Sequence, residues 1–133
     1  GQQEYEQLRQ LSYPQTDIFI VCFAVNNTAS YQNARDLWIP EVQHFCPNAL
    51  ILLAGTKTDK RDADGQERPI ISTSKVITVT YRIGYQLASR MKAAGYVECS
   101  AITGEGVKTV FDTAIRLTVA SKIHPKRRAC SIM

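Results

Sequence analysis

The sequence predicts an α/β domain built on a doubly wound parallel β-sheet. Continuous apolar runs occupy residues 18–25 and 50–55, and a shorter run covers 96–101, as expected of strands that helices cover on both faces. Stretches with apolar residues at steps of three and four follow each run, which indicates helices between the strands. The order strand, helix, strand, helix, strand, helix implies right-handed crossovers.

Each expected helix has its own boundary signals. The first contains Ser30 as a plausible N-cap and Pro40 as the point where it bends or restarts. The second ends before Gly95, a natural C′ residue, and Pro125 stops the third. The strand at 96–101 is the least hydrophobic of the three and is expected nearer the sheet edge. The helical spacing is carried by Tyr31, Ala34, Trp38, Val42 and Phe45, then by Ile83, Leu87, Met91 and Ala94, then by Val107, Val110, Phe111, Ala114, Ile115 and Thr118.

Composition fits one soluble globular domain. The chain has 133 residues, of which 44% are hydrophobic, the size of a single core. Its apolar runs are too short to span a membrane, and no signal-peptide pattern opens it. A cytoplasmic protein is therefore expected.

The cysteines and the charge argue against a zinc-binding protein and a nucleic-acid-binding protein. Four cysteines, with no C-x-x-C spacing, predict a reduced compartment and no zinc site. The net charge of +4 equals the four basic residues within 122–128, so the rest of the chain is neutral. A basic tail without a basic folded face argues against nucleic-acid binding.

The polar residues that could bind a ligand follow the second and third expected strands. Ligands of such sheets bind at the carboxyl ends of the strands, where Lys57, Asp59 and Ser100 occur. The carboxylate of Asp59 can accept from both the ring N–H and the exocyclic amine of guanine, a pair that adenine lacks. The apolar stem of Lys57 can lie along the base. A solvated loop pair is the alternative interpretation of Lys57 and Asp59.

Two motifs at these strand ends resemble those of Ras-superfamily GTPases. They are Thr56-Lys57-x-Asp59 and Glu98-Cys99-Ser100-Ala101, and threonine in the first resembles the Rho branch. The resemblance covers Gly1 to about Lys60 and about Tyr85 to Met133. It implies a sheet of the P-loop NTPase type, of which this chain would be the C-terminal half. Three longer stretches carry it further: residues 11–17, 38–47 and 96–101.

The resemblance also implies roles for individual residues. Thr56, Lys57 and Asp59 would bind the base, and the backbone N–H groups of Ser100 and Ala101 would meet the guanine carbonyl. Gly1 would contact the terminal phosphate, and Gln2 would orient the attacking water.

Several expected parts of such a domain do not occur in this sequence. There is no G-x-x-x-x-G-K-[ST] phosphate loop, so Mg²⁺ ligands are expected in a preceding half, and no metal ligand is assigned here. The run at 18–25 would then be an open sheet edge. We expect residues 1–133 alone to bind GTP negligibly and to aggregate. The Rho-type insert, at about 60–80, is rich in β-branched residues, which disfavour the helix expected there.

The last residues carry a separate signal. Cys130-Ser131-Ile132-Met133 matches the C-a-a-X prenylation pattern, in which a final methionine favours farnesyl. With the basic run before it, this predicts a peripheral protein at the cytoplasmic face of the plasma membrane. The expected organisation is a partial GTPase domain at 1–121 and a basic, prenylated tail at 122–133.

The expected function is a GTP-hydrolysing switch that signals to the actin cytoskeleton. Its implied partners are exchange factors, GTPase-activating proteins, a dissociation inhibitor, effectors and an anionic membrane surface. Two alternatives stay open: a membrane-tethered interaction module without nucleotide binding, and an unrelated nucleotide-binding α/β domain.

Overall fold

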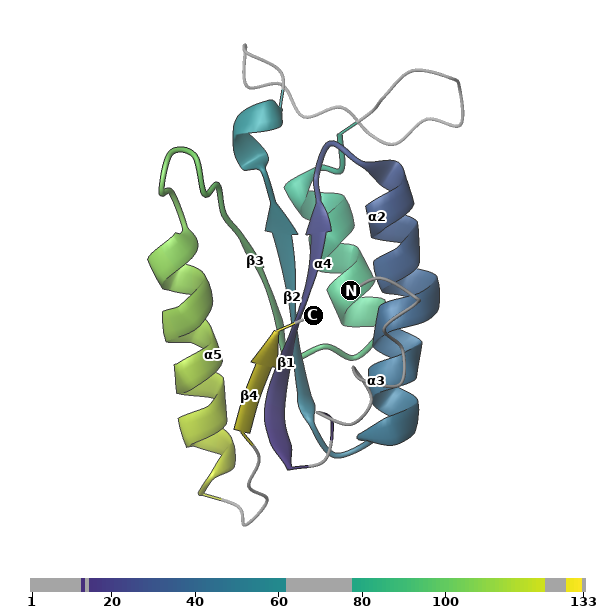
Figure 1. Ribbon diagram of the computed structural model, residues 1–133, viewed down its shortest axis with the longest axis vertical. Coiled ribbons are helices and arrows are strands. Elements are labelled where there is room, and N and C mark those ends of the chain that lie inside the picture. Colours follow the sequence, from purple (N-terminus) through teal and green to yellow (C-terminus); the bar gives the residue numbers. More distant parts are fainter. Residues whose placement is uncertain (1–12, 14, 62–77, 124–128, 133) are drawn as a thin grey trace.

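The computed structural model describes residues 13, 15–61, 78–123 and 129–132, and shows a parallel sheet with helices on both faces (Figure 1). Its strands are β1 (Thr16–Ala24), β2 (Leu50–Thr56), β3 (Gly95–Glu98) and β4 (Ala129–Ile132). The strand order is β3-β2-β1-β4, and every neighbouring pair is parallel. The predicted α/β class is confirmed, as is the place of β3 at an edge.

Two cores lie on opposite faces of the sheet because side chains of β1 alternate between them. Phe19, Val21 and Phe23 belong to a cluster that packs under the helices α2 (Thr28–Asn33), α3 (Ile39–Phe45) and α4 (Tyr81–Arg90). Ile18 and Ile20 belong to a second cluster with Val110 and Ala114 of α5. All of these β1 side chains are almost fully buried. A strand with two covered faces explains why residues 18–25 form an unbroken apolar run.

The first helical stretch is continuous but changes its winding. It comprises α2 (Thr28–Asn33), a π-helical turn η2 (Ala34–Trp38) and α3 (Ile39–Phe45). The N–H of Ile39 donates to the carbonyl of Ala34, five residues earlier. This wider turn comes just before Pro40, which has no N–H of its own. The α-helix therefore restarts at Ile39, with Pro40 in its first turn, as the prediction of a bend or restart at Pro40 implied.

The predicted N-cap Ser30 is wrong. Asn27 caps α2, because its Oδ1 accepts from the N–H of Ser30 at 3.0 Å. The hydroxyl of Ser30 instead accepts from the N–H of Ala24, the last residue of β1, at 2.9 Å. A side chain that closes the turn after the strand cannot also cap the helix.

The expected end of the second helix at Gly95 is also wrong. Helix α4 (Tyr81–Arg90) has Met91 as its C-cap, and Lys92 takes the left-handed conformation with φ 60°. The N–H of Ala94 already donates to the carbonyl of Ile51 in β2 at 2.7 Å. Gly95 is thus the first residue of β3, and Lys92 supplies the positive φ expected from glycine.

The last helix lies at its predicted position. Helix α5 spans Val107–Ser121 and buries Val110, Thr113 and Ala114. Phe111 and Ile115, which share its apolar spacing, are 46% and 62% exposed. Within the described parts of the chain, no helix is both long enough and apolar enough to cross a membrane.

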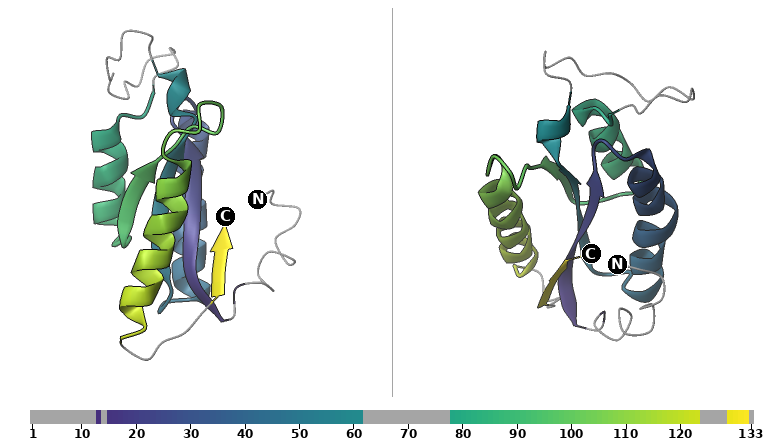
Figure 2. Two further views of the ribbon diagram at one scale, coloured as in Figure 1. Left: turned by 90° about the vertical axis from the view of Figure 1, so that its left-hand side faces the viewer. Right: turned by 45° about the horizontal axis from the view of Figure 1, so that its top comes forward.

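The expectation that residues 18–25 form an open edge requires correction. Strand β4 lies beside β1, with Ile18 opposite Cys130 and Ile20 opposite Ile132. Residues from the expected tail thus cover part of this edge (Figure 2). The expected insert and Pro125 lie largely or wholly outside the described residues.

Candidate functional site

The candidate site lies where β2 and β3 end side by side. The N–H of Cys99 donates to the carbonyl of Gly55 at 2.9 Å, and the N–H of Thr58 donates to the carbonyl of Cys99 at 3.3 Å. These bonds hold the loop after β2 against the loop after β3. The two motifs that the sequence places after separate strands are therefore adjacent, as expected of a parallel sheet.

Asp59 is fixed by a neighbour from the other loop. It lies in the short 3₁₀ turn η3 (Thr58–Lys60), and its Oδ1 accepts from the hydroxyl of Ser100 at 2.7 Å. Ser100 is almost completely buried, whereas Asp59 is half-buried. A carboxylate can accept about four hydrogen bonds, so both oxygens of Asp59 keep acceptor capacity for a ligand.

Ser100 is itself the centre of a tight loop. Its Oγ accepts from the N–H of Thr103 at 3.2 Å, and its carbonyl accepts from the N–H of Gly104 at 2.8 Å. Its N–H donates to the carbonyl of Glu105 at 2.8 Å. The backbone N–H of Ser100 thus already has a partner within the loop, and its predicted contact with the guanine carbonyl stays a prediction. The role predicted for the N–H of Ala101 stays a prediction.

This loop returns the chain into α5 at Gly106. Gly106 has φ 77°, and a Cβ there would overlap the carbonyl oxygen of Glu98 at the end of β3. Only glycine combines the positive φ with this close approach. The loop between β3 and α5 is thereby fixed, with Ser100 beside Asp59. Strand β3 ends at Glu98 rather than at the predicted residue 101.

Thr56 and Lys57 shape the other loop. The hydroxyl of Thr56 donates to the carbonyl of Phe23 at 3.1 Å, and its carbonyl accepts from the N–H of Val25 at 2.9 Å. Lys57 is exposed and adopts φ 60°, ψ 38°. A left-handed lysine is uncommon, and such residues concentrate at binding sites. Thr56 thus ties the loop to β1, and Lys57 turns the chain toward Asp59.

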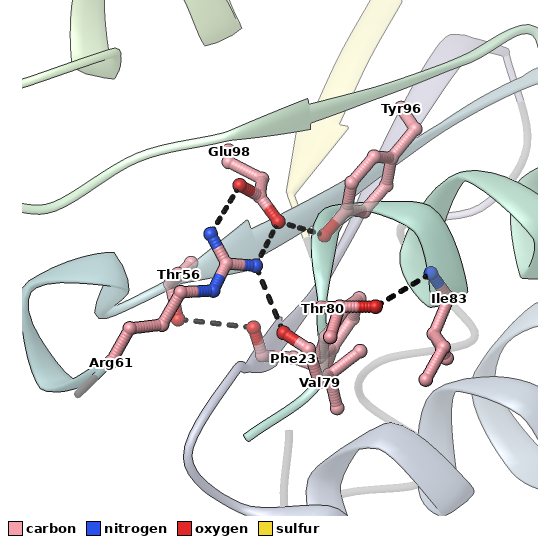
Figure 3. A network of polar contacts seen from close by, with 8 residues as sticks. All are labelled: Phe23, Thr56, Arg61, Val79, Thr80, Ile83, Tyr96 and Glu98. Carbon is pink, nitrogen blue, oxygen red and sulfur yellow. Dashed lines mark hydrogen bonds and ion pairs between the residues drawn. The ribbon is translucent and has the colours of Figure 1, made fainter. Parts of the chain in front are cut away.

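A partly buried ion pair, which the sequence interpretation missed, links the loop after β2 to the end of β3 (Figure 3). Arg61 donates to both carboxylate oxygens of Glu98, at 2.7 and 2.5 Å, and to the carbonyl of Val79 at 2.9 Å. The hydroxyl of Tyr96 donates to Glu98 at 2.6 Å. The side chains of Arg61 and Glu98 are only 15% and 14% exposed. A glutamate within a mostly apolar strand was the available signal, since a buried charge requires a partner.

Burial also changes the protonation of nearby groups. The pKa of Tyr96 lies above its ordinary value, mainly because the side chain is largely removed from water and secondly because its hydroxyl donates to Glu98. Burial, with Cys99 nearby, raises the pKa of the Cys22 thiol to about 11. Burial and then the charge of Glu98 raise the pKa of Cys99. Tyr96 therefore stays a neutral donor to Glu98, and these two cysteines stay thiols, at neutral pH.

The remaining predicted site residues are placed only in part. Gly1 and Gln2 lie outside the described residues. Cys130 stands in β4 opposite Ile18. Within 13, 15–61, 78–123 and 129–132, no group of three or more His, Cys, Asp or Glu side chains could hold a metal ion.

One comparison with known proteins bears on this site. The family model described as Ras family matches residues 1–120. The match includes both loops that meet at Asp59 and Ser100.

Proposed function

The chain belongs to the Ras family of small GTPases, and we propose that it forms the guanine-reading part of a Rho-type GTP-binding switch. Members of the Ras family bind GTP and GDP together with Mg²⁺. The proposed switch hydrolyses GTP to GDP and signals to the actin cytoskeleton. The observation that carries this proposal is the carboxylate of Asp59, held at the end of the sheet by the hydroxyl of Ser100.

The chemistry of this carboxylate favours guanine. The bond from Ser100 restricts the rotation of Asp59, so less conformational entropy is lost when the base binds. Two oxygens with remaining acceptor capacity match the ring N–H and the exocyclic amine of guanine. Adenine presents an acceptor at the equivalent ring position, which would leave the carboxylate facing a lone pair. Buried polar groups left unpaired in this way produce discrimination of about 10⁴.

The other base contacts complete the proposed site. The apolar stem of Lys57, which is exposed at the left-handed turn of the loop, would cover one face of the base. The N–H of Ala101 would meet the guanine carbonyl. Thr56 acts as a positioning residue, because its hydroxyl is bound to the carbonyl of Phe23. Gly1 and Gln2 would serve the terminal phosphate and the attacking water.

The finer assignment to the Rho branch rests on sequence. Threonine at position 56, the stretch 38–47 and the length of the segment at about 60–80 support it. Exchange factors, activating proteins, a dissociation inhibitor and effectors would then be the partners. We place the protein at the cytoplasmic face of the plasma membrane, through a prenyl group on Cys130 and the basic residues before it.

Calorimetry with the natural protein at its full natural length tests the proposal. GDP should bind at least about a thousandfold more tightly than ADP, because only guanine supplies both donors to Asp59. GTP should be converted to GDP and phosphate in the presence of Mg²⁺. Equal affinity for GDP and ADP would refute the proposed base site. Mass spectrometry of the same material reports the lipid on Cys130.

A further inference from the structure

Arg61 connects the first loop of the candidate base site to the start of α4 as well as to β3. It follows η3 directly, two residues after Asp59, and its two terminal nitrogens donate to the two carboxylate oxygens of Glu98. Its Nη2 atom also donates to the carbonyl of Val79 at 2.9 Å. Val79 directly precedes Thr80, the N-cap of α4. One guanidinium group thus joins three segments that are distant in the sequence (Figure 3).

The backbone that Arg61 binds at the start of α4 is itself held in place. Val79 is fully buried, and its N–H donates to the carbonyl of Val25, the residue after β1, at 2.6 Å. The hydroxyl oxygen of Thr80 accepts from the N–H of Ile83 at 3.1 Å and so caps the first turn of the helix. The bond to Val79 therefore ties the base loop to the sheet and to α4 together.

Glu98 ties the same guanidinium group to the second loop of the base site. It is the last residue of β3, two residues before Ser100, whose hydroxyl donates to Asp59 at 2.7 Å. Arg61 and Asp59 are likewise two residues apart in the first loop. The ion pair and this hydrogen bond thus connect the same two segments, so a shift of either segment at the ion pair would change the distance between Asp59 and Ser100.

We propose that the pair of Arg61 with Glu98 lengthens the residence time of the nucleotide and couples the base site to α4. The proposal rests on the proposed binding of guanine at Asp59. Arg61 and Glu98 are positioning residues, which act through Asp59 and Ser100 rather than on the base itself. A site whose loops are already ordered loses less entropy when a ligand binds. Coupling is reciprocal, so a nucleotide that holds the two loops together also strengthens the bond to Val79.

Lysine at position 61 should not reproduce this coupling. The guanidinium group presents its donors in one rigid plane and reaches two carboxylate oxygens and a carbonyl at once. An ammonium group is a single point of charge on a flexible stem and does not form the two parallel bonds to a carboxylate. Arg61→Lys therefore keeps the charge and removes the geometry.

Dissociation of GDP labelled on its ribose, measured with the protein at natural length, tests the residence time. Arg61→Ala should release it about tenfold faster than wild type, with association changed less than about twofold, because such contacts act mainly on dissociation. Glu98→Gln, which keeps the shape of the side chain, should release it about threefold faster. Wild-type dissociation rates in both variants would overturn the positioning role.

Val42→Ala is the control for a general loss of stability. Val42 is fully buried in α3, which precedes the start of β2, whereas the base site lies at the end of β2. This variant should unfold at a lower urea concentration than wild type and release GDP at the wild-type rate. If Val42→Ala released GDP as fast as Arg61→Ala, general destabilisation would be the cause and the positioning role would be refuted.

Hydrogen exchange tests the coupling to α4. The amides of Ile83 and Gly84 donate to Thr80, and GDP should slow their exchange at least about threefold in wild type. In Arg61→Lys the effect of GDP on these amides should be lost, and an effect equal to that in wild type would refute the coupling.

The failure of the base site itself has a different signature. A wild type without preference for GDP over ADP would refute the proposed function together with this inference. A clear preference for GDP, with wild-type dissociation in Arg61→Ala and Glu98→Gln, would refute the positioning role alone.

Discussion

At the scale of single residues, the candidate site depends on the carboxylate of Asp59, which the hydroxyl of Ser100 positions. The guanine-binding role of Asp59 could be proposed from sequence, because a carboxylate can accept from both guanine donors. The hydroxyl of Ser100 that positions it could not be assigned, since this contact depends on the loop between Ser100 and Glu105. Arg61 was missed for a similar reason: its partner Glu98 is 37 residues away in the chain.

Removing Arg61 should destabilise the chain strongly. Arg61→Ala would leave the carboxylate of Glu98, whose side chain is 14% exposed, beside Tyr96 without its cation. We expect a loss of about 3 kcal/mol, the lower end of the range for breaking a buried pair. Lys108→Ala is the matched control, because the ion pair of Lys108 with Asp112 is exposed and should contribute little. Urea unfolding of both variants measures the difference. Similar midpoints for the two variants would show that the pair of Arg61 with Glu98 does not stabilise the fold.

Tyr96 should make the protein sensitive to alkaline pH. Its folded-state pKa is raised, first by burial and then by Glu98, so above about pH 10 the unfolded chain loses a proton that the folded chain keeps. The contribution is complete below that pH and falls by about 1.4 kcal/mol per pH unit above it. Unfolding free energies of wild type and Tyr96→Phe, compared at several pH values, test this. The variant should show the shallower alkaline decline, and parallel declines would exclude Tyr96 as the cause.

At the scale of elements, apolar periodicity predicted the strands and helices, but side-chain competition set their ends. The three predicted strands and the last helix lie where the pattern placed them. The errors fell at Ser30, which closes the turn after β1, and at Gly95, which already belongs to β3. Serine and glycine suit the predicted helix caps. The hydrogen bonds from the N–H of Ala24 to Ser30 and from the N–H of Ala94 to Ile51 place these residues elsewhere.

The packing of α4 on the sheet should not tolerate a methyl group at Gly84. A Cβ there would overlap the ring of Tyr96, which Phe23, Tyr81 and Glu98 hold in place. Gly84→Ala should therefore lower the unfolding free energy by about 1–3 kcal/mol despite the better helix propensity of alanine. Gly95→Ala is the control, since its Cβ would meet only Leu52, at an ordinary 3.4 Å. Thermal unfolding midpoints of the two variants measure the difference. A Gly84→Ala variant with a raised midpoint would show that the ring of Tyr96 can move aside.

At the scale of the whole molecule, the sheet and its two covered faces were predictable, but the occupant of the β1 edge was not. Nothing in the apolar pattern indicates that Ala129–Ile132 joins the sheet, because the run is short and carries a separate lipidation signal. A second feature of this scale is an apolar stripe on α5, on the side of the helix that borders Ile18 of β1. Phe111, Ile115 and Val119 are 46%, 62% and 60% exposed and follow one another at steps of four.

This apolar stripe should drive self-association of the isolated chain. Exposed apolar patches of this kind promote aggregation. Ile115→Glu combined with Val119→Lys replaces two of its residues by an ion pair at helical spacing, and should reduce light scattering on concentration. Ile102→Glu also adds charge, but removes an isolated apolar residue, 77% exposed, outside the stripe. If Ile102→Glu improved solubility equally, charge rather than the stripe would be the cause.

The most direct test of guanine reading by Asp59 compares GDP with inosine diphosphate, which lacks only the exocyclic amine, in wild type and Asp59→Ala at natural length. Wild type should bind GDP at least about tenfold more tightly than inosine diphosphate, because one donor to the carboxylate is lost. In Asp59→Ala the two affinities should agree within about twofold, since alanine has no acceptor for that amine, whereas asparagine would keep one oxygen. A preference for GDP that survives the substitution would show that another residue reads the base.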